Sequence, residues 1–243
     1  MKRYIHQLSG WPKFHWKQEA LIELLTAARL RQGRLIGRMQ SLGFTQRGEA
    51  MLQTLTLDVV KSSEIEGEVL NPEQVRSSIA RRLGMDIAGL IPADRRVEGV
   101  VRMMLEATQN YAKPLTAERL FSWHTALFSE DRAKIRIGAW RDDAKGPMQV
   151  VSGALGRERV HYEAPPAKLL DTEMAVFLDW ANQTGGIDPL LRAAEAHLWF
   201  VTIHPFDDGN GRIARAIADW ALARSENSSH RFYSMSAQIR REN

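Results

Sequence analysis

Cysteine is absent from this chain of 243 residues. Its absence excludes a disulfide framework and a thiolate zinc site, and it fits a reducing compartment. Long hydrophobic runs are missing as well, since the longest apolar run, at 198–203, is far shorter than the ~20 residues that a membrane helix needs. The N-terminal stretch MKRYIHQLSG lacks the apolar core of a signal peptide. We therefore expect a cytoplasmic protein without membrane contact.

A large excess of charge of one sign is also lacking. The formal net charge is +4, hydrophobic residues make up 44% of the chain and charged residues 26%, which is the balance of an ordinary globular protein. Its length fits one large domain, or a core with a small appendage. The arginine pairs Arg81-Arg82 and Arg95-Arg96 indicate either a solvated surface or a contact with nucleic acid or a nucleotide, and we favour the solvated surface.

Helical periodicity dominates what is present. Apolar residues follow one helical stripe over 17–42, and a second helical segment runs from about 45 to 66. Between 135 and 162 the chain is instead rich in glycine and β-branched residues, and MQVVSG and RERVHY on either side of ALG predict a short β-hairpin. The expected fold class is all-α with one projecting hairpin. Further helices are expected to begin at Asn71, Asp94, Thr116 and Asp188.

The densest cluster of chemically active side chains is HPFDDGNGRIAR, at 204–215. Apolar periodicity on both sides makes it a helix–loop–helix junction, with Gly209, Asn210 and Gly211 at the start of the second helix. Unpaired amides and the helix dipole favour an anion there. Arg212 and Arg215 share a helix face and suit a polyphosphate, because each guanidinium can form two parallel hydrogen bonds.

Two further side chains complete this interpretation. Asp208 can hold a magnesium ion whose other ligands are phosphate oxygens. His204 is a base that titrates near neutral pH. Together, the residues predict phosphoryl-type transfer from a magnesium–nucleotide complex to a nucleophile that His204 deprotonates.

Other interpretations remain open at this point. Each residue taken singly has a structural reading, as a core histidine, a turn or a solvated arginine face. A metal-dependent hydrolase would use His197, His204, Asp207 and Asp208, but it explains neither the Gly-Asn-Gly nor the two arginines. A regulatory DNA-binding protein would fit the basic charge, but no recognition helix is evident. His124 and His197 are expected to be core or supporting residues, and His161 is unassigned.

The stretch 204–215 matches the Fic-family signature, His-Pro-Phe-x-Asp-Gly-Asn-Gly-Arg-x-x-Arg, at every fixed position. The chain thus resembles a Fic-domain protein over most of its length. The resemblance implies an all-α Fic fold with a β-hairpin flap, here at about 147–162, that docks a segment of a target protein. It also implies transfer of AMP from ATP to a hydroxyl side chain of that target. In the family's Doc-like kinase branch a lysine replaces Gly211 and the last arginine is lost, so AMP transfer is preferred to phosphate transfer.

The same resemblance assigns roles to the motif. His204 would be the base and Asp208 the Mg²⁺ ligand, while Gly209, Asn210 and Gly211 would line the phosphate site. Arg212 and Arg215 would hold the outer phosphates, and Phe206 would anchor the loop in the core. The flap residues Val150, Val151, Ser152 and Gly153 are further candidates for nucleotide binding.

SSEIEG, at 62–67, resembles the inhibitory motif of the family, Ser/Thr-x-x-x-Glu-Gly/Asn. In the class with an N-terminal inhibitory helix, Glu66 would reach Arg215, Ser62 would hydrogen-bond within the site, and Gly67 would end the helix. Glu64 does not fit the motif spacing. A solvated glutamate beside a helix-ending glycine is the alternative. We expect an N-terminal helical region at 1–93, with the inhibitory helix at about 45–67, and a catalytic core at 94–243.

Relatives usually continue beyond the point where this chain stops, so we expect it to be truncated at the C-terminus. Part of their adenine pocket lies in that continuation, and many carry a winged-helix segment there, so contact with DNA is expected only through such a missing segment. A homodimer is possible. The sequence does not decide whether Glu66 also positions a water that removes AMP, nor which protein is the target.

Overall fold

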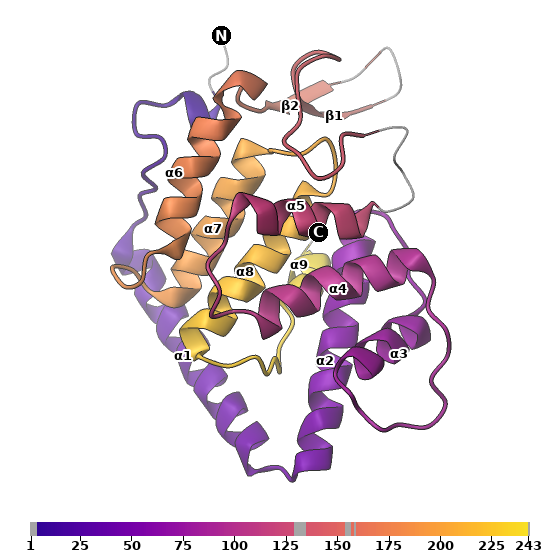
Figure 1. Ribbon diagram of the computed structural model, residues 1–243. Helices are drawn as coiled ribbons and strands as arrows, with labels where there is room; N and C mark the ends of the chain where they lie inside the picture. The colour runs from indigo at the N-terminus through magenta and orange to yellow at the C-terminus, as the bar shows by residue number, and fades with distance from the viewer. Residues whose placement is uncertain (1–3, 129–134, 154–156, 158, 243) are drawn as a thin grey trace.

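The computed structural model describes residues 4–128, 135–153, 157 and 159–242. Helices make up most of it, and one short two-stranded sheet projects at one end (Figure 1). The all-α fold class with a single hairpin is confirmed for this part of the chain. The α-helices are α1 (Gln18–Ser41), α2 (Phe44–Ile65), α3 (Pro72–Arg82), α4 (Arg95–Gln109), α5 (Ala117–Leu127), α6 (Leu170–Asn182), α7 (Pro189–Ile203), α8 (Asn210–Glu226) and α9 (Met235–Glu242). Short 3-10 turns lie at Ile5–Gln7 and Ala167–Leu169.

Helix α8 is the central element of the fold. It contacts α7 most extensively, and also α4, α2, α5 and α9 (Figure 1). Alanines such as Ala214, Ala216 and Ala218 are fully buried on it, and their small side chains let neighbouring helices approach closely. Ile213, Ile217, Trp220 and Leu222 fill the space between those neighbours. The N-terminus of α8 is therefore held rigidly from several sides.

The local signals for helix starts proved reliable. The side chains of Asn71, Asp94, Thr116 and Asp188 accept backbone N–H groups at the starts of α3, α4, α5 and α7. Each satisfies an amide that has no partner within the helix. The four predicted helix starts are confirmed.

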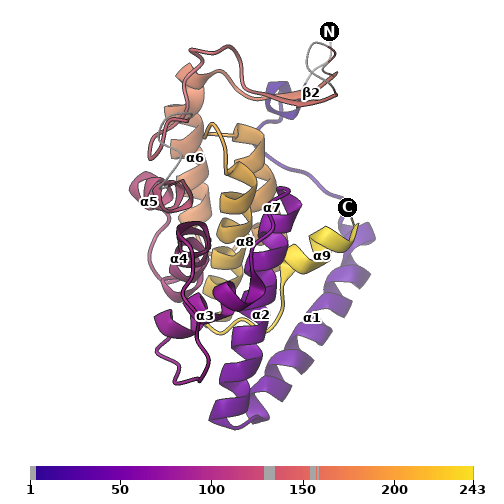
Figure 2. The same cartoon turned by 90° about the vertical axis from the view of Figure 1, so that its right-hand side faces the viewer.

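Helices α1 and α2 form a long N-terminal hairpin. α1 carries no buried residue and runs along the outer side, whereas α2 returns into the body and packs on α3 and α9 (Figures 1 and 2). Leu52, Leu55 and Val59 of α2 share one hydrophobic core with Phe206 and Ile217. This one core includes residues on both sides of the predicted boundary between 93 and 94, which falls at the start of α4. That boundary stays a prediction.

The predicted β-hairpin is confirmed at its two strands, β1 (Gln149–Ser152) and β2 (Arg159–Glu163). They pair antiparallel with Val150 opposite Tyr162, and a register irregularity follows at Val151. The tip at 154–156 and residue 158 lie outside the described residues. The Tyr162 hydroxyl donates to the carbonyl of Thr202 at 2.6 Å, which anchors β2 to the last turn of α7. The hairpin therefore projects next to the end of α7 (Figure 1).

Candidate active site

The loop between α7 and α8 begins at a strained residue. His204 ends α7 with φ 53° and ψ 58°, a left-handed conformation that costs a side chain on the order of 1–2 kcal/mol. Arg141, whose side chain is fully buried, holds this backbone. Its Nε donates to the His204 carbonyl at 2.8 Å, and its backbone N–H donates to the Pro205 carbonyl at 2.9 Å. Arg141 was not singled out in the sequence.

One contact fixes the tautomer of His204. Its Nδ1 lies 3.2 Å from the carbonyl oxygen of Val201, and a carbonyl only accepts, so Nδ1 carries the proton. The lone pair is then on Nε2. Burial lowers the pKa of His204 below its ordinary value, with the Arg141 charge as a further lowering cause. The imidazole is therefore neutral at neutral pH, with Nε2 ready to accept a proton.

The middle of the loop is anchored by aromatic packing. Phe206 is fully buried, as expected, and His124 of α5 stacks on it with ring centroids 4.2 Å apart. The Nδ1 of His124 accepts from the Gly138 amide at 3.1 Å, so its Nε2 donates to the Asp208 carbonyl at 3.2 Å. Burial lowers the pKa of His124 to about 4, which keeps this bridging tautomer neutral. His124 is thus a supporting residue.

The start of α8 presents unpaired amides. Gly209 precedes the helix with φ 78°, and the amides of Asn210, Gly211 and Arg212 have no acceptor among the described residues. The Asn210 side chain is not available to a ligand, because it bonds the backbone N–H and carbonyl of Phe206 at 3.0 and 2.8 Å. Of the predicted phosphate site, the backbone amides of Asn210 and Gly211 have no acceptor among the described residues, whereas the Gly209 amide donates to Asp208 and the Asn210 side chain closes the loop.

The predicted inhibitory residues lie directly on this helix start. Glu66 follows the last residue of α2, and its Oε1 accepts from Arg215 Nη2 at 2.7 Å. The Ser62 hydroxyl and carbonyl accept from Arg215 Nε and Nη2, both at 2.8 Å. Gly67 has φ 79° at the helix end. A Cβ on Gly211 would overlap the Glu66 carboxylate, so that carboxylate fills the space above the first turn of α8.

Arg215 needs an anionic partner in this position. Its side chain is only 5% exposed, and burial lowers its pKa while the Glu66 carboxylate opposes the shift. A buried guanidinium without a counter-charge is costly. Either Glu66 or an anionic ligand must therefore accompany it.

Comparison with known proteins identifies a domain within the chain. Residues 114–222 match the model of the Fic/DOC family, and the motif at 204–215 lies within them together with α5, α6 and α7. The chain carries a Fic domain. A Fic domain containing signaling protein from Bacteroides thetaiotaomicron VPI-5482 has the same fold, with a TM-score of 0.64 at 20% identity over 87% of this chain and 77% of that one. A Fic family protein from Desulfovibrio desulfuricans G20 gives a TM-score of 0.63 at 26% identity over 95% and 65%.

Curated relatives match this chain over shorter segments. The uridine 5'-monophosphate transferase of Xanthomonas campestris pv. campestris (strain 8004) is 32% identical over 120 residues, which are 46% of this chain and 21% of the relative. The protein adenylyltransferase fic-1 of Caenorhabditis elegans is 50% identical over 50 residues, 20% of this chain and 10% of the relative. This chain thus spans 21% or less of the length of these relatives. Residues 4–85 match a domain of unknown function, DUF4172.

The two acids of the Fic motif have different environments. The Asp207 carboxylate accepts from the Arg136 amide at 2.8 Å, whereas the side chain of Asp208 is 61% exposed. Asp208 also accepts from the Gly209 amide and lies 4.0 Å from Arg212. Within the described residues no three His, Asp or Glu side chains are grouped to hold a metal ion. The ligand cluster that a hydrolase would need from His197, His204, Asp207 and Asp208 is therefore not formed.

A second carboxylate on the Fic motif was missed. Glu68 accepts two hydrogen bonds from Arg212 Nη1, at 3.0 and 2.8 Å. It stands two residues beyond Glu66, outside the inhibitory pattern, and no local signal distinguishes it from a solvated acid. Only the packing of α2 against α8 places it there. Glu64, which does not fit the motif spacing, pairs instead with Lys61 on its own helix at 2.7 Å.

Sequence reasoning also missed the buried network that fixes α2 against α8. Asp219 of α8 pairs with Arg231 at 3.2 Å, and Asp58 of α2 bonds the Ser234 hydroxyl and the Ser236 amide. Complete burial, followed by the charge of Asp58, raises the pKa of Asp219 well above its ordinary value. The segment after α8 thus joins the helix that carries Glu66 to the helix that carries Arg215.

The flap residues lie apart from these contacts. Val150 and Val151 are 42% and 47% exposed, and Ser152 bonds His161 at 2.6 Å. Gly153 is exposed, with φ 111°. Among the described residues none of the four hydrogen-bonds to 204–215, so their assignment to nucleotide binding stays a prediction.

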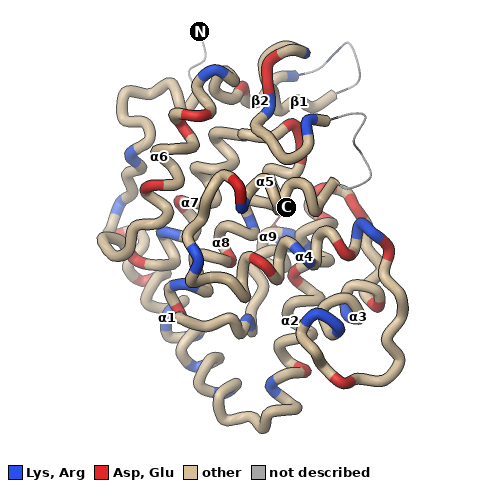
Figure 3. The backbone as a smooth tube through the Cα atoms, in the orientation of Figure 1, with Lys and Arg blue, Asp and Glu red and all other residues tan. Residues whose placement is uncertain are grey.

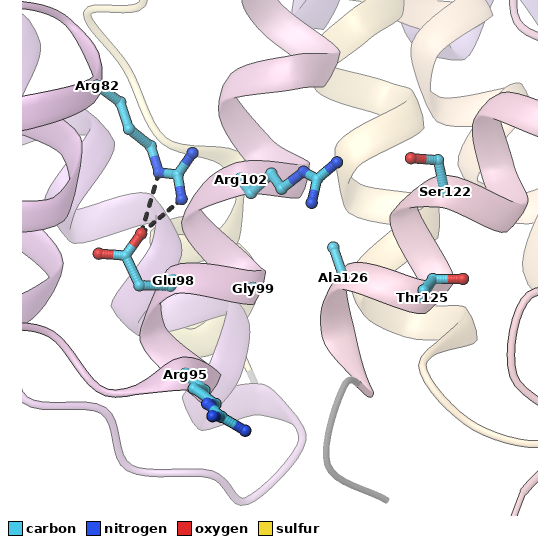
Figure 4. Close-up of a pocket in the computed structure, with 8 residues that line it drawn as sticks. All are labelled: Arg82, Arg95, Glu98, Gly99, Arg102, Ser122, Thr125 and Ala126. Carbon is cyan, nitrogen blue, oxygen red and sulfur yellow. Dashed lines mark hydrogen bonds and ion pairs between the residues drawn. The ribbon is translucent and has the colours of Figure 1, made fainter. Parts of the chain in front are cut away.

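A groove of about 380 Å³ lies between α4 and α5 (Figure 4). Arg102 extends toward α5 there, while Arg82 bonds Glu98, which also pairs with Arg81. Figure 3 shows acidic and basic positions interspersed along the chain. The Arg81-Arg82 pair is therefore at least partly neutralised on the surface, and no motif residue lines the groove. No described helix is long and apolar enough to cross a bilayer.

Proposed function

We propose that this protein transfers AMP from ATP to a hydroxyl side chain of a target protein, and that α2 holds the activity back. One observation carries the proposal. The neutral His204 and the unpaired amides of 210–212 flank one loop, and the buried guanidinium beside them is paired with a glutamate of another helix. A base, an anion-binding helix start and a removable counter-ion are what regulated phosphoryl transfer requires.

His204 would act as the general base. Its Nε2 accepts the proton of the target hydroxyl as the hydroxyl oxygen forms a bond to the α-phosphorus. The bond from that phosphorus to the bridging β-phosphate oxygen breaks, and pyrophosphate leaves. The Val201 carbonyl keeps the opposite nitrogen protonated, so the imidazole presents the correct lone pair before the substrate binds. Its lowered pKa avoids a protonated, inactive form near neutral pH.

The phosphates would lie over the start of α8. The amides of 210–212 supply donors, and Arg212 and Arg215 supply charge. Asp208 fits a magnesium ligand, because its carboxylate is exposed beside these donors and one carboxylate is enough when phosphates provide other ligands. Bound magnesium would neutralise phosphate charge.

Glu66 supplies the restraint. Its carboxylate fills the space above Gly211 and accepts a hydrogen bond from Nη2 of Arg215, so a phosphate in that position must displace it. The Ser62 contacts hold Arg215 in place for Glu66. The inhibitory role of α2, suggested by SSEIEG, therefore has a stereochemical basis: competition between a carboxylate and a phosphate for one guanidinium.

A relative named as a uridine 5'-monophosphate transferase makes the nucleotide a point to test. The decisive experiment is intact-mass analysis of Glu66→Gly after incubation with magnesium and either ATP or UTP. We expect one or more added AMP groups on the protein itself or on a co-incubated target, and none with His204→Ala in the same background. Added UMP in place of AMP would correct the nucleotide, and no addition of either would overturn nucleotidyl transfer.

A further inference from the structure

Glu68 pairs with the other arginine of the motif, as Glu66 pairs with Arg215. Its two carboxylate oxygens lie 3.0 and 2.8 Å from Arg212 Nη1. The Arg212 side chain is only 4% exposed, and its guanidinium lies over the Phe128 ring at 5.1 Å. Arg212 is therefore a buried, oriented cation, and Glu68 accepts both of the hydrogen bonds that it donates to a carboxylate.

The two glutamates are presented by one turn. The Glu66 amide donates to Ser63 O and the Gly67 amide donates to Glu64 O, while the Glu68 amide returns to Ser63 O at 3.0 Å. This is the hydrogen-bond pattern of a helix that ends at a left-handed glycine. Because Gly67 reverses the chain, Glu66 and Glu68 both face α8, and their carboxylates reach arginines one helical turn apart.

We propose that Glu68 is a second inhibitory carboxylate, which withholds Arg212 from the nucleotide phosphates while Glu66 withholds Arg215. The inference rests on the proposed function, because it assigns the two arginines to phosphate binding. It adds that the restraint has two parts. Removal of Glu66 alone frees one guanidinium and leaves the turn attached to α8 through the other.

The remaining neighbours of Arg212 support this assignment. Asp208 lies 4.0 Å from Arg212 Nη2, too far for a hydrogen bond, so Glu68 is its only close carboxylate among the described residues. Arg212 Nε is buried and has no partner in the described chain. A ligand anion that replaced Glu68 would therefore bind a guanidinium that the Phe128 ring and α8 already hold in position. Glu68 itself is 39% exposed, so it can swing into water at little cost.

The test measures ligand affinity separately from transfer. A non-hydrolysable ATP analogue with magnesium would be titrated by calorimetry into wild type, Glu68→Gln, Glu66→Gly and the double variant. Glu64→Gln is the matched control, since Glu64 lies on the same helix but pairs with Lys61. AMP addition by the same proteins would be followed by intact mass.

We expect Glu68→Gln to tighten analogue binding by roughly 1.5- to fivefold, the range for a partly exposed ion pair that competes with the ligand. The double variant should bind more tightly, and transfer AMP faster, than Glu66→Gly, while Glu64→Gln matches wild type. Unchanged or weaker binding by Glu68→Gln would overturn the inference and make Glu68 a support for Arg212. Tighter binding without AMP addition by any variant would instead reject the proposed transfer. The inference that Glu68 competes with the ligand for Arg212 would then still hold.

Discussion

Glu66 Oε1 and Arg215 Nη2 lie 2.7 Å apart, although 149 residues separate them in the chain. One is at the end of α2, and the other is in the second turn of α8. The Ser62 hydroxyl and carbonyl complete the set of acceptors around the guanidinium. This contact makes the end of α2 part of the Fic site.

Glu66→Gly should raise AMP addition by about 10- to 100-fold, because a carboxylate favoured by ~2 kcal/mol over the phosphate suppresses the productive pose by a similar factor. Arg215→Ala should not reproduce this gain, since it removes the anchor of both the carboxylate and the phosphate. The rates of wild type and the two variants would be compared on one target by intact mass. Equal rates for wild type and Glu66→Gly would mean that SSEIEG is only a helix end.

Loss of His204 should reduce transfer by about 10²- to 10⁴-fold in the Glu66→Gly background, as expected for a general base. His204→Asn is the preferred variant, because asparagine tolerates the left-handed backbone at this position better than alanine. Analogue binding should stay near that of the parent protein. A variant that keeps most of the rate would remove His204 from the base role.

The same parent protein should show a defined pH profile. Burial lowers the pKa of His204, so the active, neutral form should persist below pH 6.5 and be lost only as the pH falls through the lowered value. The rate of Glu66→Gly would be measured from pH 8 to pH 5. An acid limb centred at or above pH 6.5 would contradict this assignment.

Arg231→Ala should destabilise the fold by roughly 3 kcal/mol, because it leaves the carboxyls of Asp219 and Glu226 without their buried partner. Its own side chain is only 2% exposed. Urea unfolding followed by circular dichroism would give the difference. Arg240→Ala is the control, since Arg240 is 48% exposed and should change stability by less than ~0.5 kcal/mol. Similar values for both variants would show that the network contributes little.

Stability should decline in mild acid because of His124. Its folded pKa of about 4 lies below the ordinary 6.5, so between these values the unfolded chain binds a proton that the native state does not. The stabilisation is complete above pH 6.5 and is lost as the pH falls toward 4, by at most about 3 kcal/mol for this residue. His197, whose pKa burial also lowers to about 4, acts in the same direction.

Urea unfolding between pH 7 and pH 4.5 would measure that slope. His124→Gln should be less stable than wild type at pH 7, because the bonds to Gly138 and Asp208 are disturbed. Its stability should nevertheless fall less steeply with acid. If the stability of His124→Gln fell with acid as steeply as that of wild type, groups other than His124 would cause the acid sensitivity.

The sequence by itself determined the helices and hairpin strands and the position of the motif. Helix periodicity, the capping side chains of Asn71, Asp94, Thr116 and Asp188, and the fixed spacing of 204–215 act over a few residues, so they can be interpreted without a fold. The match of SSEIEG to an inhibitory motif likewise located Glu66, and the structure places its carboxylate on Arg215.

Only the tertiary structure decided which distant side chains meet. Arg141 on the His204 backbone, His124 beneath Asp208 and Glu68 on Arg212 all join segments far apart in the chain. An arginine or glutamate on a helix surface has the same local pattern whether it meets solvent or a partner. Its role depends on how α2, α5, α7 and α8 pack. That packing is set by the shared hydrophobic core, in which no single stretch of sequence specifies a pair of contacting residues.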